Sequence, residues 1–343
     1  SWRRDVTDLL GRPLECRVLV LLAWASLVLA APVPPERVVD LVRPIVGTAR
    51  KDQRIGAVNS GQTFPAVGRP FGMTHWTPQT QASEDKCIAP FYAQDEGFQG
   101  IRASHWWSGS CTHDFGSATV AVITGDLVVD PEARASAFGR PGEVMSPAYY
   151  AVTLDDPGVR VEVTATARAA LLRFTFQRDG PASILVHANR KTRGAISGGR
   201  VRVDRERKSI EVSNPVQRIY AGSGRPAGFS GHTVVRIEAP SGEAGTWSGS
   251  TVRPGQAAAD GTGDVFGGYL RFAVRAGDVV VARAGTSFTS IAAARRNLDA
   301  EIGTARFEAI RARTEAAWEA ALGRIRVKGG SLEERQTFYT ALY

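Results

Sequence analysis

The sequence predicts a mainly β fold, an antiparallel β-sandwich followed by helices, and three observations support this. Its 36 glycines and 18 prolines are spread over 343 residues without a short repeat, as is typical of many turns between short strands. From about Tyr149 to Phe288 apolar and polar residues alternate with period two, which indicates strands. After Ser290 the period changes to 3.6, which indicates helices. An all-helical bundle is therefore excluded.

We expect strands at seven segments of the alternating region: YYAVTLDD, VRVEVTATA, LLRFTFQ, SILVHA, RVRVDRERKSIEVS, HTVVRIEAP and GGYLRFAVRAGDVVVARAG. Turn residues such as those at 155–158 separate them, and no helical period lies between them, so the pairing should be antiparallel. Residues 36 to about 125 lack this alternation. They are interpreted as a loop-rich zone that holds most of the unusual side chains.

The helical region should begin at Ser290, which can cap a helix from Ile291 to about Ile302. A second helix places Phe307, Ile310 and Trp318 on one face. The segment RIRVKGG is then expected to be a short strand. Ser331 and Glu334 form a capping box for a third helix, SLEERQTFYTALY.

The N-terminus has the pattern of a signal peptide, which we assign to residues 1–31. Basic residues precede an apolar run within residues 17–31, and small residues follow it, so cleavage is expected after Ala30 or Ala31. The run is short for a membrane-spanning helix. We therefore expect a secreted or periplasmic protein without a membrane anchor after cleavage.

The net charge of +8 does not indicate a nucleic-acid partner. Only five of the 42 basic residues are lysine, and the arginines are scattered among small and apolar residues instead of clustered. No recognised nucleic-acid motif accompanies the charge.

No complete catalytic set is apparent in the loop-rich zone. Its acids show no spacing that would fix an acid and a base on one element, and are expected to be solvated loop residues: Asp85, Asp95, Glu96 and Asp114. The local histidines lack metal-motif spacing, so no metal site is predicted: His75, His105 and His113. The G-x-S-x-G motif of a serine nucleophile is absent.

The stretch from Ser104 to Asp114, SHWWSGSCTHD, carries the strongest chemical pattern. Aromatic rings beside hydroxyls, glycines and a carboxylate suit sugars, whose apolar faces stack on aromatic planes while their hydroxyls need polar partners. The alternative is that Trp106 and Trp107 fill a core or an interface.

Eight ordered segments then resemble glycoside hydrolase family 92: DLVRPIVGT, GQTFPAVGRPFGMTHWTPQT, DKCIAPFY, FQGIRASHWWSGSCTHDFGS, YYAVTLDD, RIYAGSGRPAGFSG, ARAGTSFTSIAAARRNL and FYTALY. They run from Asp40 to Tyr343. The resemblance implies an exo-acting, calcium-dependent α-mannosidase that inverts the anomeric centre and acts on mannose-containing glycans. It also implies a supersandwich domain at 32–288, a helical linker at 289–326 and the start of a truncated (α/α)6 barrel at 327–343.

By this resemblance, the catalytic acid and base and the calcium ligands belong to the remainder of the barrel, so no catalytic or metal residue is assigned. The sandwich should contribute the pocket rim, and seven residues are predicted to bind substrate there: Gly61, Gln62, Phe64, Lys86, Cys87, His105 and Asp114. Lys86 replaces an aromatic residue common in α-1,2-specific members, and Gln62 replaces a common asparagine. The ammonium group favours a linkage other than simple α-1,2-mannobiose, with a phosphodiester-linked mannose as one option. The alternative is that Lys86 is a solvated surface charge.

Two alternatives remain open at this stage. Cys87 and Cys111 could form a disulfide closing a loop of about 24 residues, or could be free thiols at the rim. The chain could also be a carbohydrate-binding sandwich without turnover, or a partner-binding β-domain with a Trp-rich surface.

Overall fold

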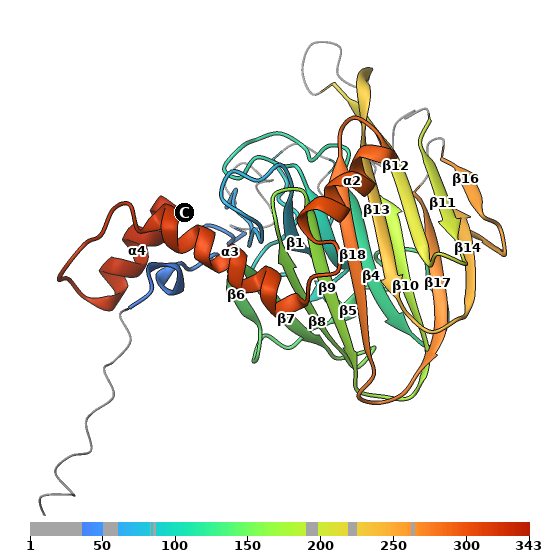
Figure 1. The fold of residues 1–343 in the computed structure, drawn as a ribbon, viewed down its shortest axis with the longest axis horizontal. Helices are drawn as coiled ribbons and strands as arrows, with labels where there is room; N and C mark the ends of the chain where they lie inside the picture. The colour runs from blue at the N-terminus through green and yellow to red at the C-terminus, as the bar shows by residue number, and fades with distance from the viewer. Residues whose placement is uncertain are drawn as a thin grey trace, which may run out of the picture. The chain divides into compact units, whose positions relative to one another are not determined.

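The structure, a computed structural model, describes residues 36–50, 61–82, 84, 87–189, 198–218, 225–261 and 265–343. The expected signal peptide at 1–31 lies outside these residues, and so does Lys86. Two large antiparallel sheets dominate the described part of the chain (Figure 1). The predicted fold class, mainly β with an antiparallel sandwich followed by helices, is confirmed.

The first sheet has seven strands in the order β1-β3-β4-β10-β17-β14-β15. Their bounds in this order are His75–Gln79, Gly100–Ser104, Ala118–Thr124, Gly180–Ala188, Phe266–Val274, Glu243–Ser248 and Thr251–Pro254. A separate pair joins β2 (Gly97–Phe98) to β5 (Ser136–Ala137).

The second sheet has nine strands in the order β16-β11-β12-β13-β18-β9-β8-β7-β6. Their bounds in this order are Ala258–Asp260, Arg200–Asp204, Ser209–Gln217, Pro226–Glu238, Val279–Ser287, Ala169–Phe176, Val159–Ala165, Tyr149–Leu154 and Val144–Ser146. All seven segments with period-two alternation form strands of the two sheets, as predicted.

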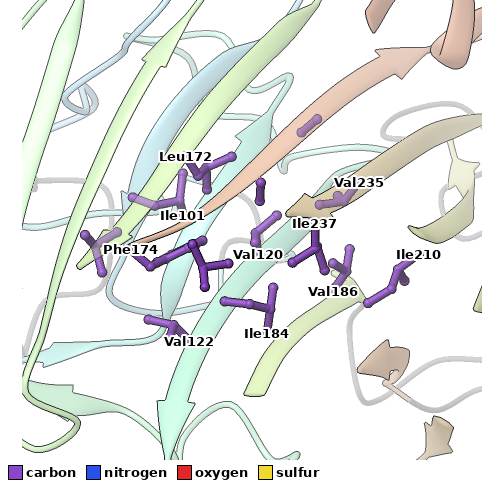
Figure 2. Packing of buried hydrophobic residues seen from close by; sticks show 14 of the residues in the cluster. Ile101, Val120, Val122, Leu172, Phe174, Ile184, Val186, Ile210, Val235 and Ile237 are labelled. Atoms are coloured by element: carbon purple, nitrogen blue, oxygen red, sulfur yellow. The ribbon is translucent and has the colours of Figure 1, made fainter. Parts of the chain in front are cut away.

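The main core lies where the inner faces of the two sheets meet. Figure 2 shows aliphatic and aromatic side chains from β3, β4 and β10 of the first sheet packed with others from β9, β12 and β13 of the second. Ile184 and Leu172 are both fully buried there. Because alternate residues of a strand face opposite sides, this shared core requires the period-two pattern seen in the sequence.

The interpretation of residues 36–125 as loop-rich was wrong for three segments. They form β1, β3 and β4, the three neighbouring strands at one edge of the seven-stranded first sheet. All five residues of β3 and six of the seven in β4 are buried. Both faces of these strands are covered, so apolar and polar residues do not alternate along them.

Three helices follow the last strand, coloured red in Figure 1. They are α2 (Ile291–Glu301), α3 (Phe307–Leu322) and α4 (Leu332–Leu342). The predicted caps are present: Ser290 accepts a hydrogen bond from the backbone of Ala293, and Ser331 with Glu334 forms a capping box. The strand expected at RIRVKGG is absent, since residues 324–330 form turns and irregular backbone.

Helix α2 packs closely on the outer face of the second sheet. A side-chain carbon at Gly285 of β18 would lie 2.5 Å from the carbonyl oxygen of Ala294 in α2. Leu298 of α2 joins Leu171 of β9 and Ile310 of α3 in a second apolar cluster. Helices α2 and α3 therefore cover part of the face of the second sheet that does not contribute to the main core.

The short 3₁₀ helix η1 (Val38–Leu41) packs against the last two helices. Val38 and Leu41 share an apolar cluster with Leu322 of α3 and Tyr339 of α4. The backbone N–H of Val39 also donates to the carboxylate of Glu319, at 3.1 Å. Within the described residues, no helix combines the length and hydropathy needed to cross a membrane.

Candidate functional site

A cavity of about 720 Å³ opens between the sandwich loops and the C-terminal helices. The sandwich side contributes Thr63, Phe64, His75 and Ser108, while the helical side contributes residues of α3 and α4. The remaining lining residues are Arg43, Pro44, Val46, Gly47, Ala66, Trp318, Glu333, Gln336, Thr337, Thr340, Ala341 and Tyr343. A volume of this size lies within the range of small-molecule binding pockets.

Two hydrogen bonds hold the sandwich side of the cavity to the helices. The indole N–H of Trp318 in α3 donates to the carbonyl of Gly68 at 2.6 Å. The hydroxyl of Tyr343 donates to the carbonyl of Ala66 at 2.7 Å. Both acceptors lie in the loop that precedes β1, so helices more than 240 residues away along the chain fix the position of this wall.

The glycine of the TFP motif is required by a close approach of two backbone segments. A side-chain carbon at Gly61 would lie 1.9 Å from the carbonyl oxygen of Gly47. Next to it, the side-chain amide of Gln62 donates to the carbonyl of Cys87 at 3.1 Å, and the backbone carbonyl of Gln62 accepts from the backbone N–H of Gly109. Gln62 thus joins the loop at 87 to the loop at 109.

Cys87 and Cys111 form a disulfide, with their Cα atoms 4.0 Å apart. The structure therefore favours the bridged alternative over free thiols. The backbone N–H of Cys87 also donates to the carbonyl of Thr112 at 3.2 Å. These contacts tie the loop at 87 to the SHWWSGSCTHD stretch.

Asp114 is buried and binds only other groups of the protein. Its carboxylate accepts hydrogen bonds from the guanidinium of Arg102 at 2.7 Å and from the hydroxyl of Ser104 at 2.9 Å. It also accepts from the backbone N–H groups of His105 and Phe115, at 2.9 and 2.8 Å. The expectation of a solvated loop acid was wrong here, because this carboxylate is the counter-ion of a fully buried arginine.

Arg102 is the centre of this buried polar network. Besides Asp114, its guanidinium binds Glu84, Gln79 and Ser117. Burial by itself would lower the pKa of Arg102, but the two carboxylates outweigh it and the pKa is raised. The side chain is therefore a permanent buried cation with matched partners.

His105 also has protein partners on both ring nitrogens. Nε2 lies 3.1 Å from the hydroxyl of Thr74, and Nδ1 lies 3.0 Å from the carbonyl of Phe115. Burial lowers its pKa, an effect that Asp114 partly offsets. A neutral imidazole in this position holds the loop at 115 against the start of β1.

The two tryptophans of the stretch have different environments. Trp106 is buried, donates its indole N–H to the carbonyl of Thr112 at 2.8 Å, and packs against Phe64 with ring centroids 5.8 Å apart. Trp107 is 69% exposed. The core interpretation therefore holds for Trp106 only.

Of the seven predicted rim residues, Phe64 is the one described residue that lines the cavity. Gly61, Gln62, Cys87, His105 and Asp114 form a layer behind the wall and fix its loops. Lys86 lies outside the described residues.

The sequence reasoning missed several lining residues, among them His75, Ser108 and Glu333. The position of His75 at the cavity could have been predicted from the segment THWT, in which His75 directly precedes a large apolar residue, Trp76. Trp76 belongs to the main core, so the neighbouring side chain must point to the opposite side of the strand.

The described residues do not fit a calcium site. Calcium prefers six to eight oxygen ligands, with several carboxylates among them. The described part of the chain contains no cluster of three or more metal-ligating side chains, and the oxygens of Asp114 are taken up by Arg102, Ser104 and two backbone N–H groups. Among the described lining residues, Glu333 is the sole carboxylate.

Two family models match the chain in succession. Residues 41–287 match the glycosyl hydrolase family 92 N-terminal domain. Residues 293–343 match the glycosyl hydrolase family 92 catalytic domain. The first match ends where β18 ends, and the second begins inside α2.

Similar proteins are found among solved structures and among curated sequences. A family 92 inverting mannosidase of Bacteroides thetaiotaomicron is 27% identical, with a TM-score of 0.77 over 90% of this chain and 39% of that enzyme. A family 92 α-mannosidase of the same organism has the same fold at 22% identity, with a TM-score of 0.76 over 90% of this chain and 40% of the other.

An uncharacterized secreted glycosidase of Arthroderma benhamiae is 25% identical over 324 residues, covering 85% of this chain and 40% of the relative. The chain thus spans about two fifths of the length of each of these three proteins.

Proposed function

Because the chain belongs to glycoside hydrolase family 92, we propose that it is part of a secreted enzyme that removes terminal α-linked mannose from glycans with inversion. The similarity to an inverting mannosidase supports the substrate and the stereochemistry, and the secreted relative supports the location. The predicted signal peptide at 1–31 agrees with export.

The cavity is the observation that carries this proposal. Its wall combines residues from both matched regions: Phe64, His75 and Ser108 belong to the N-terminal match, while Glu333 and Thr340 belong to the catalytic match. A sugar bound there would contact the sandwich on one side and the first catalytic helices on the other.

We propose the division of the chain predicted from the sequence: a sandwich domain at 32–288, a linker at 289–326 and the start of the catalytic barrel from 327. Support for the first boundary comes from the end of β18 at Ser287 and the start of α2 at Ile291. The boundary between the two family matches falls in the same interval.

In this proposal the chain binds and orients the sugar, and does not by itself supply the acid and the base. Inverting hydrolysis uses two carboxyl groups about 6.5–9.5 Å apart, with a water between one of them and the sugar. Glu333 is the one carboxylate on the described cavity wall, and no described partner carboxylate lines it. The pair and the calcium ligands of the family are proposed to lie in barrel segments outside this chain.

The residues behind the wall have a positioning role in this proposal. Gln62, the Cys87–Cys111 bridge, His105 and Asp114 hold the loops that present Phe64 and Ser108. Phe64 supplies an apolar ring suited to the apolar face of a sugar. The role of Lys86 at the leaving-group side remains a prediction from the sequence.

The test is an assay of the product of the complete reading frame, starting with the sequence downstream of the Tyr343 codon. We expect hydrolysis of an aryl α-mannoside but not of the β-anomer, and loss of activity with a calcium chelator. Inversion predicts that NMR detects β-mannose as the first product. Binding of mannosides without turnover would instead support a non-catalytic carbohydrate-binding sandwich.

A further inference from the structure

His75 is the first residue of β1, opposite Ser104 of β3. Its neighbours in sequence point to the other side of the strand: Trp76 is fully buried in the main core, and the hydroxyl of Thr74 binds Thr286 at 2.7 Å. Alternation along the strand therefore directs the imidazole of His75 away from the core, and it lines the cavity.

The imidazole has a defined position but no hydrogen-bond partner among the residues that the structure describes. It packs against the ring of Phe64 in an edge-to-face arrangement with centroids 6.3 Å apart. Gly68 lies beside it, since a side-chain carbon there would be in van der Waals contact with Nδ1, at 3.9 Å. In the described part of the chain, neither ring nitrogen of His75 makes a hydrogen bond, in contrast to both nitrogens of His105.

A half-buried imidazole without partners is a binding group for a ligand that can both donate and accept. A neutral imidazole has one N–H donor and one acceptor nitrogen, and a sugar hydroxyl has the matching acceptor and donor. Polar groups withdrawn from water without a partner cost free energy, which a ligand hydroxyl would recover. Ser108 lines the same wall, and its hydroxyl also has no described partner.

The electrostatic surroundings keep His75 neutral. Burial and the nearby His105 lower its pKa, and Asp114 offsets this in part. Among the described residues, those on the cavity wall that carry a charge are Arg43 and Glu333, one of each sign. This wall therefore suits an uncharged hydroxyl-bearing ring better than a phosphate or a carboxylate.

We propose that His75 is a substrate-binding residue of the cavity, which hydrogen-bonds a hydroxyl group of an uncharged sugar ring packed against Phe64. This inference rests on the proposed function, because it places the sugar in the same cavity. It adds a residue that contacts the substrate and a preference for a neutral ring.

Three substitutions in the full-length enzyme separate hydrogen bonding from packing. His75→Gln keeps a donor and an acceptor, His75→Phe keeps an aromatic ring against Phe64 without either, and His75→Ala removes both. We expect kcat/KM for an α-mannoside to fall about tenfold or more in the Phe and Ala variants, and about threefold or less in the Gln variant.

The matched control is His232→Gln. His232 is a half-buried histidine of β13 whose Nδ1 lies 2.9 Å from the hydroxyl of Ser213, and it does not line the cavity. Its kinetics should equal those of the wild type. Thermal unfolding of every variant checks that it is folded, and the Gln and Ala variants keep the test valid if the Phe variant unfolds.

The pH dependence gives a readout that packing alone would not change. The KM of the wild type should rise as the pH falls below the usual histidine range, because protonation removes the acceptor nitrogen. This rise should be absent in His75→Gln.

The proposal would be overturned if the wild type, His75→Phe and His75→Ala had equal kcat/KM. It would also be overturned if His75→Phe kept a higher kcat/KM than His75→Gln. A wild-type enzyme that neither binds nor cleaves α-mannosides would overturn the proposed function itself, and this outcome is visible before any variant is made.

Discussion

Asp114 and Arg102 show how the chain uses charge at the level of single residues. Both side chains are inaccessible to solvent, and the pair shares its hydrogen bonds with Ser104, Gln79 and Ser117. Each member of a buried ion pair needs an opposite charge and hydrogen-bond partners, because an unpaired buried charge costs several kcal/mol. The most polar residues of the loop zone therefore organise the loops behind the cavity.

Asp114→Asn should destabilise the protein by about 3–5 kcal/mol, because it leaves Arg102 buried with one carboxylate fewer. Urea unfolding at pH 7 measures the change. The control is Asp260→Asn, which removes an ion pair with Arg200 in which both side chains are more than 60% exposed. That change should cost less than about 1 kcal/mol. Equal effects of the two substitutions would contradict the role of burial.

His187 should make stability depend on pH. It is buried beside Arg134, whose guanidinium donates to Nδ1 at 3.1 Å, so Nδ1 must be unprotonated. Burial, together with Arg134 and Arg102, lowers its pKa well below 6.5. The unfolded chain takes up a proton below about pH 6.5 that the folded chain excludes, so stability is lost as the pH falls through that range.

The expected slope for His187 is about 1.4 kcal/mol per pH unit, until its folded pKa is reached. His75 and His105 add slopes of the same sign, since their pKa values are also lowered. Urea unfolding between pH 7 and 5 should show a shallower dependence in His187→Phe than in the wild type. An unchanged slope would show that His187 titrates normally in the folded protein.

At the level of elements, the contact between α2 and β18 depends on one missing side chain. Gly285→Ala places a carbon 2.5 Å from a backbone oxygen of α2, so the helix must move away from the sheet. We expect a loss of about 1–3 kcal/mol, measured by chemical unfolding. Gly139→Ala is the control, because the nearest atoms to the added carbon lie 3.8 Å away. A loss in the control as large as that of Gly285→Ala would contradict the role of the clash, because glycine-to-alanine replacement at a permissive position lowers the entropy of the unfolded chain and so favours folding.

The Cys87–Cys111 bridge should stabilise the loops of the cavity wall. Closing a loop of 24 residues contributes about 3 kcal/mol in the loop-entropy model. Alkylation of the denatured 343-residue chain without reductant should add one label, at Cys16, and three after reduction. Three labels without reductant would show that the bridge does not form.

The alternating strands could be predicted because one face of each is apolar and the other polar, as in Arg200–Asp204 with every second residue buried. Ala118–Thr124 could not be recognised in this way, because its two faces are both covered. The same limit applied to the site. The sequence pointed to the correct loops, but it could not distinguish Phe64, which lines the cavity, from Asp114, which is paired with an arginine 12 residues away.

At the level of the whole molecule, the described wall of the cavity carries one carboxylate, Glu333, and therefore no acid and base pair. We expect the 343-residue chain alone, purified with calcium present, not to hydrolyse an aryl α-mannoside. Without the pair, essentially all of the rate enhancement is lost. Turnover above a buffer blank would contradict this expectation. The product of the complete reading frame, assayed in parallel, is the positive control.

The contact between η1 and the last helices has a consequence for how the chain folds. The backbone N–H of Val39 binds Glu319, which lies 280 residues further along the chain. The carbonyl of Ala66 binds Tyr343, which lies 277 residues further along. Such long loops are closed late and slowly, because their entropy is lost before the contacts are gained. Because the chain is synthesised from its N-terminus, Val38 and Leu41 are made before α3 and α4, against which they pack. The apolar groups of η1 therefore lack these partners until α3 and α4 have been synthesised.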